Sequence, residues 1–183
     1  MSGSSSAVSA GAAGIDSSEV ARALEEKYDA ILREHGPALR RVAAIYEADP
    51  VRREDLFQDV CLALWQALPR FRGDCSERTF AFRIAHNRGL SHGWKSRGRT
   101  ADLDEAEEIP DTRRDPESEL CDRDRRERLR EAVRRLPPGA RQVVALSLEG
   151  LSHREIGEVL GLTENNVAVR LTRARKLLRE ILG

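Results

Sequence analysis

Apolar and polar residues alternate along most of the chain with the period of an α-helix. In residues 54–68 the apolar side chains recur every three or four positions, as Phe57, Val60, Cys61, Leu64 and Leu68. This spacing puts them on one face and predicts a helix with that face buried, ended by Pro69.

The same period predicts three more helices in the first half of the chain. One covers residues 18–34 and is closed by Gly36 and Pro37, and a second runs from Pro37 to about Ala48. Another begins near Glu77 and continues into a basic segment. Its expected core-facing residues are Phe80, Ala81, Ile84 and Ala85.

The last third of the chain predicts a helix-turn-helix. Helices over residues 126–135 and 139–148 precede it. Ser152 followed by Glu155 is a capping box that starts the first helix of the motif. Gly161 supplies the positive φ that the turn needs, and Thr163 caps the second helix. The buried stripe of that helix is Val167, Leu171, Ala174 and Leu178.

Composition favours helices with small cores over sheets, because charged residues make up 34% of the chain and aromatic residues only 4%. Residues 101–124 carry eleven acids, three arginines and two prolines, and such a segment cannot bury enough apolar surface to fold alone. We therefore predict an all-α protein with two small helical domains, 18–99 and 126–183. An acidic flexible linker, 100–125, joins them, and a disordered Ser/Gly/Ala tail, 1–17, precedes them.

Several classes of protein are excluded by the sequence pattern. No run of about 18 or more apolar residues occurs, so no membrane span is expected, and the first residues do not resemble a secretion signal. Three cysteines without a C-x-x-C pair and four scattered histidines predict neither disulfides, a metal site nor a cofactor. We expect a cytoplasmic protein with reduced thiols that is monomeric when free.

Charge is distributed unevenly, although 31 basic and 31 acidic residues cancel overall. Residues 69–99 hold eight basic residues and two acids, and residues 129–183 hold ten basic residues and six acids. Two basic blocks on either side of an acidic connector indicate two separate phosphate-binding surfaces.

The second helix of the helix-turn-helix offers polar residues opposite its buried stripe. Asn165, Asn166 and Val169 lie at its N-terminal end, where a recognition helix enters the major groove. Asn can bond to adenine, and a Val methyl suits thymine. The other outward residues suited to bases or phosphates are Arg170, Thr172, Arg173 and Lys176. The spacing alone leaves open an ordinary hydrated face.

Two other clusters carry candidate chemistry. Asp55, Gln58, Asp59 and Trp65 lie along one helix, and three interpretations stay open for them: a protein partner, a solvated face or a divalent metal. In residues 71–99 arginines are interleaved with Phe, His and Trp, a mix typical of nucleic-acid contacts.

These three clusters, in this order, resemble a bacterial RNA polymerase sigma factor of the extracytoplasmic-function (ECF) group. The stretch EDLFQDVCLALWQALPRFRG followed by FRIAHN is similar to sigma region two, and RQVVALSLEGLSHREIGEVLGLTENNVAVRLTRARKLL is similar to sigma region four. The chain departs from common relatives in having Phe80 in place of a Trp and Asn165-Asn166 in place of Gly-Thr.

The resemblance implies a role for each cluster. Docking on the clamp helices of the largest subunit of core RNA polymerase would fall to Asp55, Gln58, Asp59 and Trp65. Melting and capture of the −10 promoter element would fall to Arg72, Arg83, His86, Asn87, Lys95 and Arg97. Reading of the −35 element would fall to Asn165, Asn166, Val169, Arg170, Thr172, Arg173 and Lys176. An anti-sigma factor is a further partner of many such proteins, and the polymerase performs all bond chemistry.

Two other functions compete with this one. A conventional helix-turn-helix regulator would use only residues 126–183 on DNA and leave the first half for sensing or dimerisation. A metal-dependent nuclease or phosphohydrolase would use Asp55 and Asp59, but the sequence offers no complete ligand set beside them.

Overall fold

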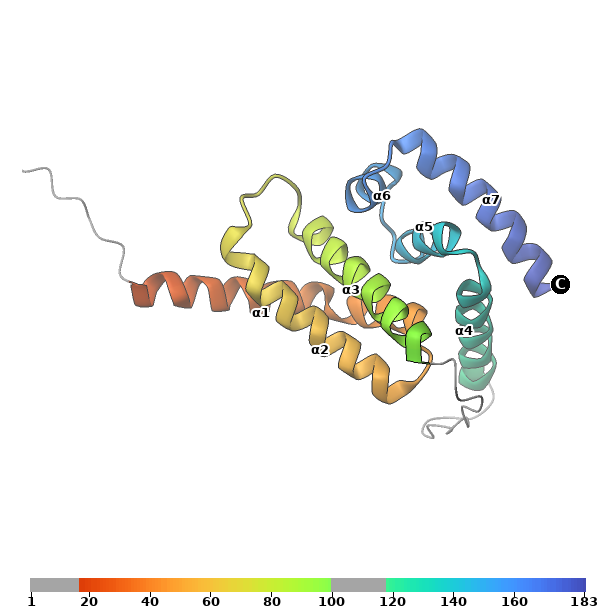
Figure 1. The fold of residues 1–183 in the computed structure, drawn as a ribbon, viewed down its shortest axis with the longest axis horizontal. Coiled ribbons are helices and arrows are strands. Elements are labelled where there is room, and N and C mark those ends of the chain that lie inside the picture. Colours follow the sequence, from red (N-terminus) through yellow and green to blue (C-terminus); the bar gives the residue numbers. More distant parts are fainter. Residues whose placement is uncertain (1–16, 100–117) are drawn as a thin grey trace, which may run out of the picture.

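The computed structural model of the chain describes residues 17–99 and 118–183, and the side chains of residues 17–93 and 124–183. These residues form helices and no strand, which confirms the predicted all-α class (Figure 1). In chain order the helices are α1 (Ser17–Tyr46), α2 (Pro50–Ala67), the 3-10 helix η1 (Leu68–Arg70), α3 (Glu77–Arg99), α4 (Ser118–Arg135), α5 (Pro138–Leu148), α6 (His153–Leu160) and α7 (Glu164–Leu182). The predicted tail and most of the predicted linker lie outside the described residues.

Helix α1 is continuous, so the predicted break at Gly36 and Pro37 is wrong. Proline removes one intrahelical hydrogen bond and crowds the preceding turn, which usually ends or kinks a helix. Here Pro37 lies on the exposed side of α1, while Ile31 and Leu39 are buried on either side of it. Packing of α1 against α2 and α3 therefore outweighs the local preference for a break.

Helix α2 begins at Pro50, before the stretch predicted to be helical, and ends at Ala67, close to the predicted end at Pro69. The Asp49 side chain accepts a hydrogen bond from the Arg52 backbone N–H at 2.8 Å, and Pro50 occupies the first helical position. The predicted stripe is buried except for Cys61, which is half-buried, and Leu56 joins it at 1% exposure.

Helix α3 begins at Glu77 as predicted but buries a different aromatic ring. The Ser76 hydroxyl caps the helix by accepting from the Thr79 backbone N–H at 3.0 Å. Phe82 is buried, whereas Phe80 is only half-buried and stacks on Phe71, with the ring centroids 4.5 Å apart. Phe80 packs against the core cluster while staying partly exposed, and Phe82, which was not among the predicted core-facing residues, is the fully buried ring.

Helix α4 begins at Ser118, inside the segment predicted to be linker, and so is longer than expected. The helix-turn-helix formed by α6 and α7 has the predicted local structure. Ser152 and Glu155 form the reciprocal capping box, and hydrogen bonds from Ser152 hold the pKa of Glu155 below its usual value. Gly161 has φ 68°, and the Thr163 hydroxyl accepts from the Asn166 backbone N–H at 3.3 Å.

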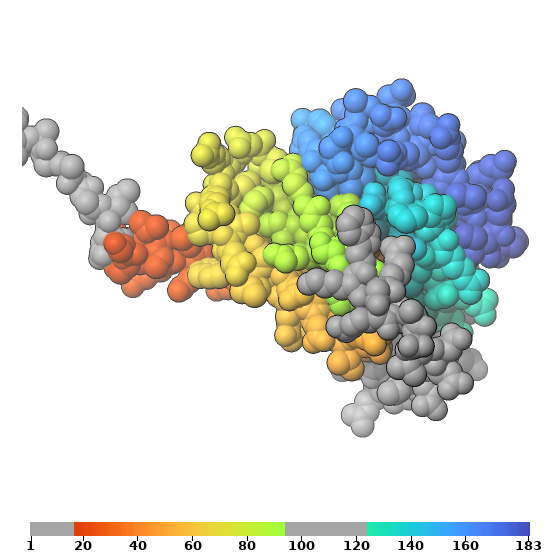
Figure 2. All heavy atoms as spheres, viewed as in Figure 1, coloured from red at the N-terminus to blue at the C-terminus, as the bar shows by residue number. Residues whose placement is uncertain are grey.

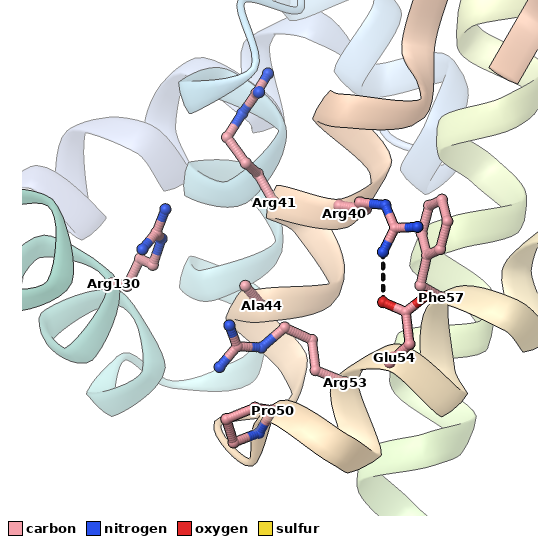
Figure 3. A pocket seen from close by; sticks show the side chains of 8 residues that line it. All are labelled: Arg40, Arg41, Ala44, Pro50, Arg53, Glu54, Phe57 and Arg130. Atoms are coloured by element: carbon pink, nitrogen blue, oxygen red, sulfur yellow. Dashed lines mark hydrogen bonds and ion pairs between the residues drawn. The ribbon is translucent and has the colours of Figure 1, made fainter. Parts of the chain in front are cut away.

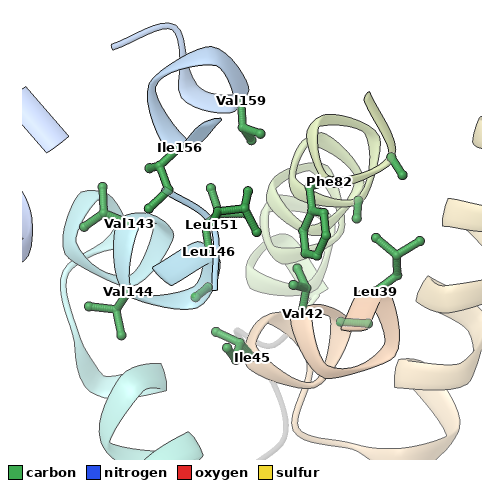
Figure 4. Packing of buried hydrophobic residues seen from close by; sticks show 14 of the residues in the cluster. Leu39, Val42, Ile45, Phe82, Val143, Val144, Leu146, Leu151, Ile156 and Val159 are labelled. Atoms are coloured by element: carbon green, nitrogen blue, oxygen red, sulfur yellow. The ribbon is translucent and has the colours of Figure 1, made fainter. Parts of the chain in front are cut away.

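The hydrophobic core is shared between the two halves of the chain. One cluster of buried apolar residues includes members of α1, α2 and α3 as well as α4, α5, α6 and α7. Figure 4 shows Val42 of α1 and Phe82 of α3 facing Leu146, Leu151 and Val159 of the C-terminal half. The predicted domains therefore contact each other directly.

The turn of the helix-turn-helix predicts a strict requirement for Gly157. A Cβ at this position would lie 2.5 Å from the Leu162 carbonyl oxygen, a backbone atom that cannot rotate away. We expect Gly157→Ala to lower the free energy of unfolding by about 1–3 kcal/mol, measured by urea denaturation.

The matched control is Gly36→Ala in α1, where an added Cβ meets no atom within 4 Å. Alanine is the better helix former, so this variant should be as stable as the wild type or gain up to about 1 kcal/mol. Equal stabilities of the two variants would show that α6 and α7 do not pack as described.

Candidate protein and nucleic-acid interfaces

The residues predicted for a protein partner are exposed on α2. Asp55, Gln58 and Asp59 lie at the surface, and Trp65 continues the same side with 39% of its area exposed. Leu62 is exposed between them. The structure therefore brings the predicted residues to one face, where acidic side chains flank apolar ones.

Trp65 is held in place by a residue that the sequence analysis did not single out. The Tyr28 ring of α1 meets it edge to face, with the centroids 5.3 Å apart, and the Tyr28 hydroxyl donates to the Cys61 carbonyl at 3.3 Å. An edge-to-face pair fixes the orientation of an aromatic ring. The Trp65 indole is thus a preorganised contact point. The apolar periodicity of the sequence could not show the Tyr28–Trp65 pair, because the two residues lie on different helices.

The residues predicted for the −10 element are only partly available on the surface. Arg72 and Asn87 are exposed, and so is Arg88, which the sequence analysis overlooked although it is a basic residue next to Asn87. Arg83 is half-buried and donates to the Glu158 carbonyl of α6 at 2.9 Å. The predictions for Lys95 and Arg97 fall outside the side chains that the structure describes.

His86 does not reach the surface, contrary to what its predicted contact with DNA requires. Only 4% of it is exposed, and its Nδ1 lies 2.6 Å from the Tyr46 hydroxyl. Burial lowers its pKa to about 4, so the imidazole is neutral near pH 7 and carries no charge for a phosphate. In this structure His86 is a core residue that positions α3 against α1.

The residues predicted for the −35 element line the outer side of α7. Asn165, Asn166, Val169, Arg173 and Lys176 are all exposed. The charges and amides expected to meet DNA are therefore open to solvent.

Two other α7 residues differ from these in their surroundings. Arg170 is half-buried, with its guanidinium close to Gly139 at the start of α5. The exposed Thr172 hydroxyl donates to the Ala168 carbonyl at 3.0 Å, within its own helix. With this bond in place, the Thr172 methyl group and the acceptor lone pairs of its hydroxyl oxygen are available for a contact with DNA.

An arginine-lined hollow of about 320 Å³ lies between α1, α2 and α4 (Figure 3). Its lining residues are Arg40, Arg41, Ala44, Pro50, Arg53, Glu54, Phe57 and Arg130. No periodicity in the sequence indicates this hollow, because its lining residues come from three separate helices.

Each arginine of this hollow already has an acceptor in the chain. Arg40 pairs with Glu54 and lies over the Phe57 ring, and Arg130 pairs with Glu127 at 2.8 Å. Arg53 donates to the Ala48 carbonyl at 2.6 Å. Arg41 binds Glu149. Of these bonds, only the one between Arg41 and Glu149 joins the two halves of the chain.

The described helices include none long and apolar enough to cross a membrane. No group of three or more His, Cys, Asp or Glu residues that could hold a metal ion occurs among the residues that the structure describes. Asp55 and Asp59 thus have no third ligand of these types grouped with them in that part of the chain.

Comparison with known proteins gives the family. Residues 31–100 match the sigma-70 region 2 family, and residues 126–178 match the sigma-70 region 4 family. The chain is 30% identical over 158 residues to the RNA polymerase sigma factor NccH of Alcaligenes xylosoxydans, covering 83% of this chain and 84% of that one. It is 28% identical over 170 residues to the sigma factor CnrH of Cupriavidus metallidurans, covering 86% and 87%.

Solved structures give the same result for the fold. The structure of CnrH in complex with the cytosolic domain of CnrY matches with a TM-score of 0.66 and 26% identity, over 89% of this chain and 94% of that chain. The sigma factor RpoE of Bartonella quintana, in complex with the anti-sigma factor NepR, matches with a TM-score of 0.68. Its 21% identity extends over 86% of this chain and 97% of that chain.

The chain belongs to the ECF group of RNA polymerase sigma factors, as its sequence predicted. Proteins of this kind bind core RNA polymerase and direct transcription initiation at specific promoters. The alternative of a conventional helix-turn-helix regulator is not favoured, because the region 2 match lies outside the helix-turn-helix.

The buried His86 predicts a stability that falls with acidification. The unfolded chain takes up a proton on this imidazole below about pH 6.5, and the folded chain does so only near pH 4. Between these values the unfolded state binds more protons, so stability is lost as pH falls. From pH 7 to pH 5 we expect this group to reduce the free energy of unfolding by about 2 kcal/mol.

Chemical denaturation at both pH values, together with NMR titration of the imidazole, measures this effect. His86→Gln cannot take up the proton and should reduce the pH dependence by the same amount. An imidazole pKa near 6.5 in the folded protein would contradict the buried position of His86.

Proposed function

We propose that the exposed side of α2 docks on the clamp helices of the largest subunit of core RNA polymerase. Asp55 and Asp59 supply negative charge, and Gln58 supplies hydrogen-bonding groups. Trp65, oriented by Tyr28, supplies an aromatic anchor of the kind that dominates protein interfaces. The exposure of all four residues on one helix is the observation that carries this proposal.

We propose that α3 and the loop before it capture the −10 element as a melted strand. Arg72 and Asn87 are exposed there, and Arg83 lies one helical turn before Asn87 on the same side. Arginines would bind phosphates, and the amide of Asn87 would contact a base edge. We extend this surface to Arg88, and Lys95 and Arg97 are included on the sequence alone.

We propose that α7 reads the −35 element as duplex DNA. Its N-terminal end presents Asn165, Asn166 and Val169 for base edges, with Arg173 one turn further along. Lys176 and the partly buried Arg170 would bind phosphates, and Thr172 lies between them in the sequence. The Gly161 turn and the cap by Thr163 fix where this helix begins relative to α6.

We infer a cytoplasmic protein that is monomeric when free, in line with a core that closes within one chain. It performs no bond chemistry itself. We also propose an anti-sigma factor as a partner. In support, the solved relative RpoE is in complex with the anti-sigma factor NepR, and CnrH is in complex with the cytosolic domain of CnrY. Run-off transcription by core polymerase with and without the chain, followed by mapping of transcript starts, tests the whole function.

Docking through α2 predicts a specific effect of charge reversal. Asp59→Arg should weaken binding to core polymerase about tenfold or more, since it replaces attraction by repulsion at the interface, while the exposed site leaves the fold intact. The matched control is Glu25→Arg, the same kind of reversal at an exposed position of α1 outside the docking face. Equal affinities of both variants, measured by fluorescence anisotropy with labelled chain, would overturn the docking proposal.

Base reading by α7 predicts that Arg173 discriminates between sequences. Arg173→Ala should cost the holoenzyme about 1–3 kcal/mol on its mapped promoter if the guanidinium contacts a base. Arg175→Ala, at an exposed position of the same helix, should weaken all DNA alike. A uniform loss for Arg173→Ala across promoter and scrambled duplexes would assign that residue to a phosphate instead.

A further inference from the structure

The arginine-lined hollow between α1, α2 and α4 carries an excess of positive charge. Four of its eight lining residues are arginines, and Glu54 is the one carboxylate among the eight (Figure 3). Pro50, the first residue of α2, also lines the hollow, so the positive end of the α2 dipole lies at the same place. Small-molecule sites occupy about 300–1,000 Å³. The volume of about 320 Å³ falls within this range.

The hollow lies at the seam, which is the contact between residues 17–99 and residues 118–183. Figure 2 shows the two halves of the chain meeting along this seam. Helices α1 and α2 supply one side of the hollow, and α4 supplies the other. In Figure 3 the Arg53 side chain reaches from α2 toward α4, which carries Arg130. A ligand in the hollow would therefore contact both halves.

Arg53 has less compensation for its charge than the other arginines of the hollow. Its guanidinium donates to the Ala48 carbonyl at 2.6 Å and to the Glu47 carbonyl at 3.4 Å. Within the part of the chain that the structure describes, it forms no ion pair with a carboxylate. Burial lowers the pKa of Arg53, and the positive charge of Arg134 lowers it further. A negatively charged ligand beside Arg53 would offset this unfavourable environment.

Arg130 has a partner that a ligand can replace. It pairs with Glu127 of its own helix at 2.8 Å, and the two side chains are 34% and 51% exposed. An exposed ion pair of this kind contributes little to stability. Glu127 also accepts from Arg134 at 3.1 Å, so it stays compensated when Arg130 binds another acceptor.

A stacked pair forms another wall of the hollow. The Arg40 guanidinium lies over the Phe57 ring, 3.8 Å from its centroid, and pairs with Glu54. About half of the Arg40 side chain is exposed. A planar guanidinium stacks on aromatic rings, including nucleic-acid bases. The hollow therefore combines donors for phosphates with a surface on which a base can stack.

The geometry favours a small phosphorylated ligand over a DNA backbone. The arginines come from three helices and line one concave site, whereas the phosphates of a duplex follow an extended path along the helix axis. Neighbouring phosphates of one small molecule place several negative charges close together, and each can accept the forked hydrogen bonds of a guanidinium.

We propose that the hollow binds a nucleotide with a diphosphate group, with Arg53 and Arg130 on the phosphates and the base against Arg40. The ligand bridges α1 and α2 to α4, and thereby adds a contact between the two halves of the chain. None of the lining residues belongs to the faces proposed for polymerase or promoter DNA, so this binding stands apart from those functions.

Calorimetric titration of the full-length chain with ADP measures this binding. Pyrophosphate, adenosine and sulfate are titrated separately. We expect pyrophosphate to bind about tenfold more weakly than ADP, because it has no base to stack. Adenosine and sulfate should show no measurable binding. Sulfate with the affinity of ADP would show an adventitious ion only, and pyrophosphate with that affinity would overturn the nucleotide as the ligand.

Two substitutions in the hollow test the arginines. Arg53→Gln and Arg130→Gln should each weaken ADP binding about tenfold, because each removes charge-assisted hydrogen bonds to phosphate. The combined variant should lose about a hundredfold. Urea denaturation without ligand checks the fold of each variant. Arg130→Gln by itself decides the outcome if Arg53→Gln unfolds the chain, since the Arg130 ion pair lies within one exposed helix face.

The matched control is the double variant Arg52→Gln with Arg128→Gln. These arginines are exposed on the same two helices, do not line the hollow, and change the net charge by the same amount. At about 0.15 M salt, where charges at a distance are screened, the control should change ADP affinity by less than about twofold. ADP should also raise the urea midpoint of the control and of the parent chain, but not of the Arg53→Gln/Arg130→Gln variant.

Absence of ADP binding by the parent chain would overturn the proposal, and so would equal losses in the control and the hollow variant. A duplex of random sequence provides the last comparison. If this duplex displaces ADP and itself loses affinity by the same factor in the Arg53→Gln/Arg130→Gln variant, the hollow holds a DNA backbone instead of a nucleotide.

Discussion

Burial of the apolar faces of α5 and α6 against α1 and α3 is the contact on which the arrangement of the whole molecule depends. Each half of the chain is small, and a helical unit of this size buries little surface alone. Leu151 and Val159 pack against Phe82, which belongs to the other half of the chain. The two halves therefore pack against each other, and this contact decides which faces are open to a partner and which are covered.

The basic residues of this protein serve two purposes. The charge distribution marks residues 69–99 as a phosphate-binding block, yet Arg78 and Arg83 from this block bind carbonyl groups of the C-terminal half. Arginine suits both tasks, because its planar guanidinium donates several hydrogen bonds to any oxygen acceptor with negative potential. A cluster of basic residues in the sequence therefore indicates a surface that can bind phosphates. It does not show whether acceptors from the same chain already bind those residues.

How far the sequence predicted the structure depended on whether the signals were local. The helix-turn-helix was predicted almost residue by residue, since Ser152, Gly161 and Thr163 act on backbone groups within a few positions of themselves. The exposed face of α2 followed from its sharp apolar stripe in the same way. These features needed no knowledge of distant contacts.

Predictions failed where distant helices decide the outcome. Helix α1 stays helical at Pro37 because it packs against other helices. Phe82 is buried more fully than Phe80 because of where α3 meets the rest of the fold. His86 resembles a surface residue in sequence, but the Tyr46 hydroxyl from α1 gives its ring a buried partner. The hollow between α1, α2 and α4 and the seam between the halves are tertiary features of the same kind.

The acceptors that Arg78 and Arg83 use at the seam are backbone carbonyls, and this has a consequence for evolution. Every amino acid carries the same carbonyl, so residues 149 and 158 are free to vary without removing the oxygen that each arginine binds. Correlated substitution between aligned relatives would therefore miss these two contacts. Arg41 and Glu149, by contrast, meet through their side chains, so this contact would leave a trace of correlated substitution.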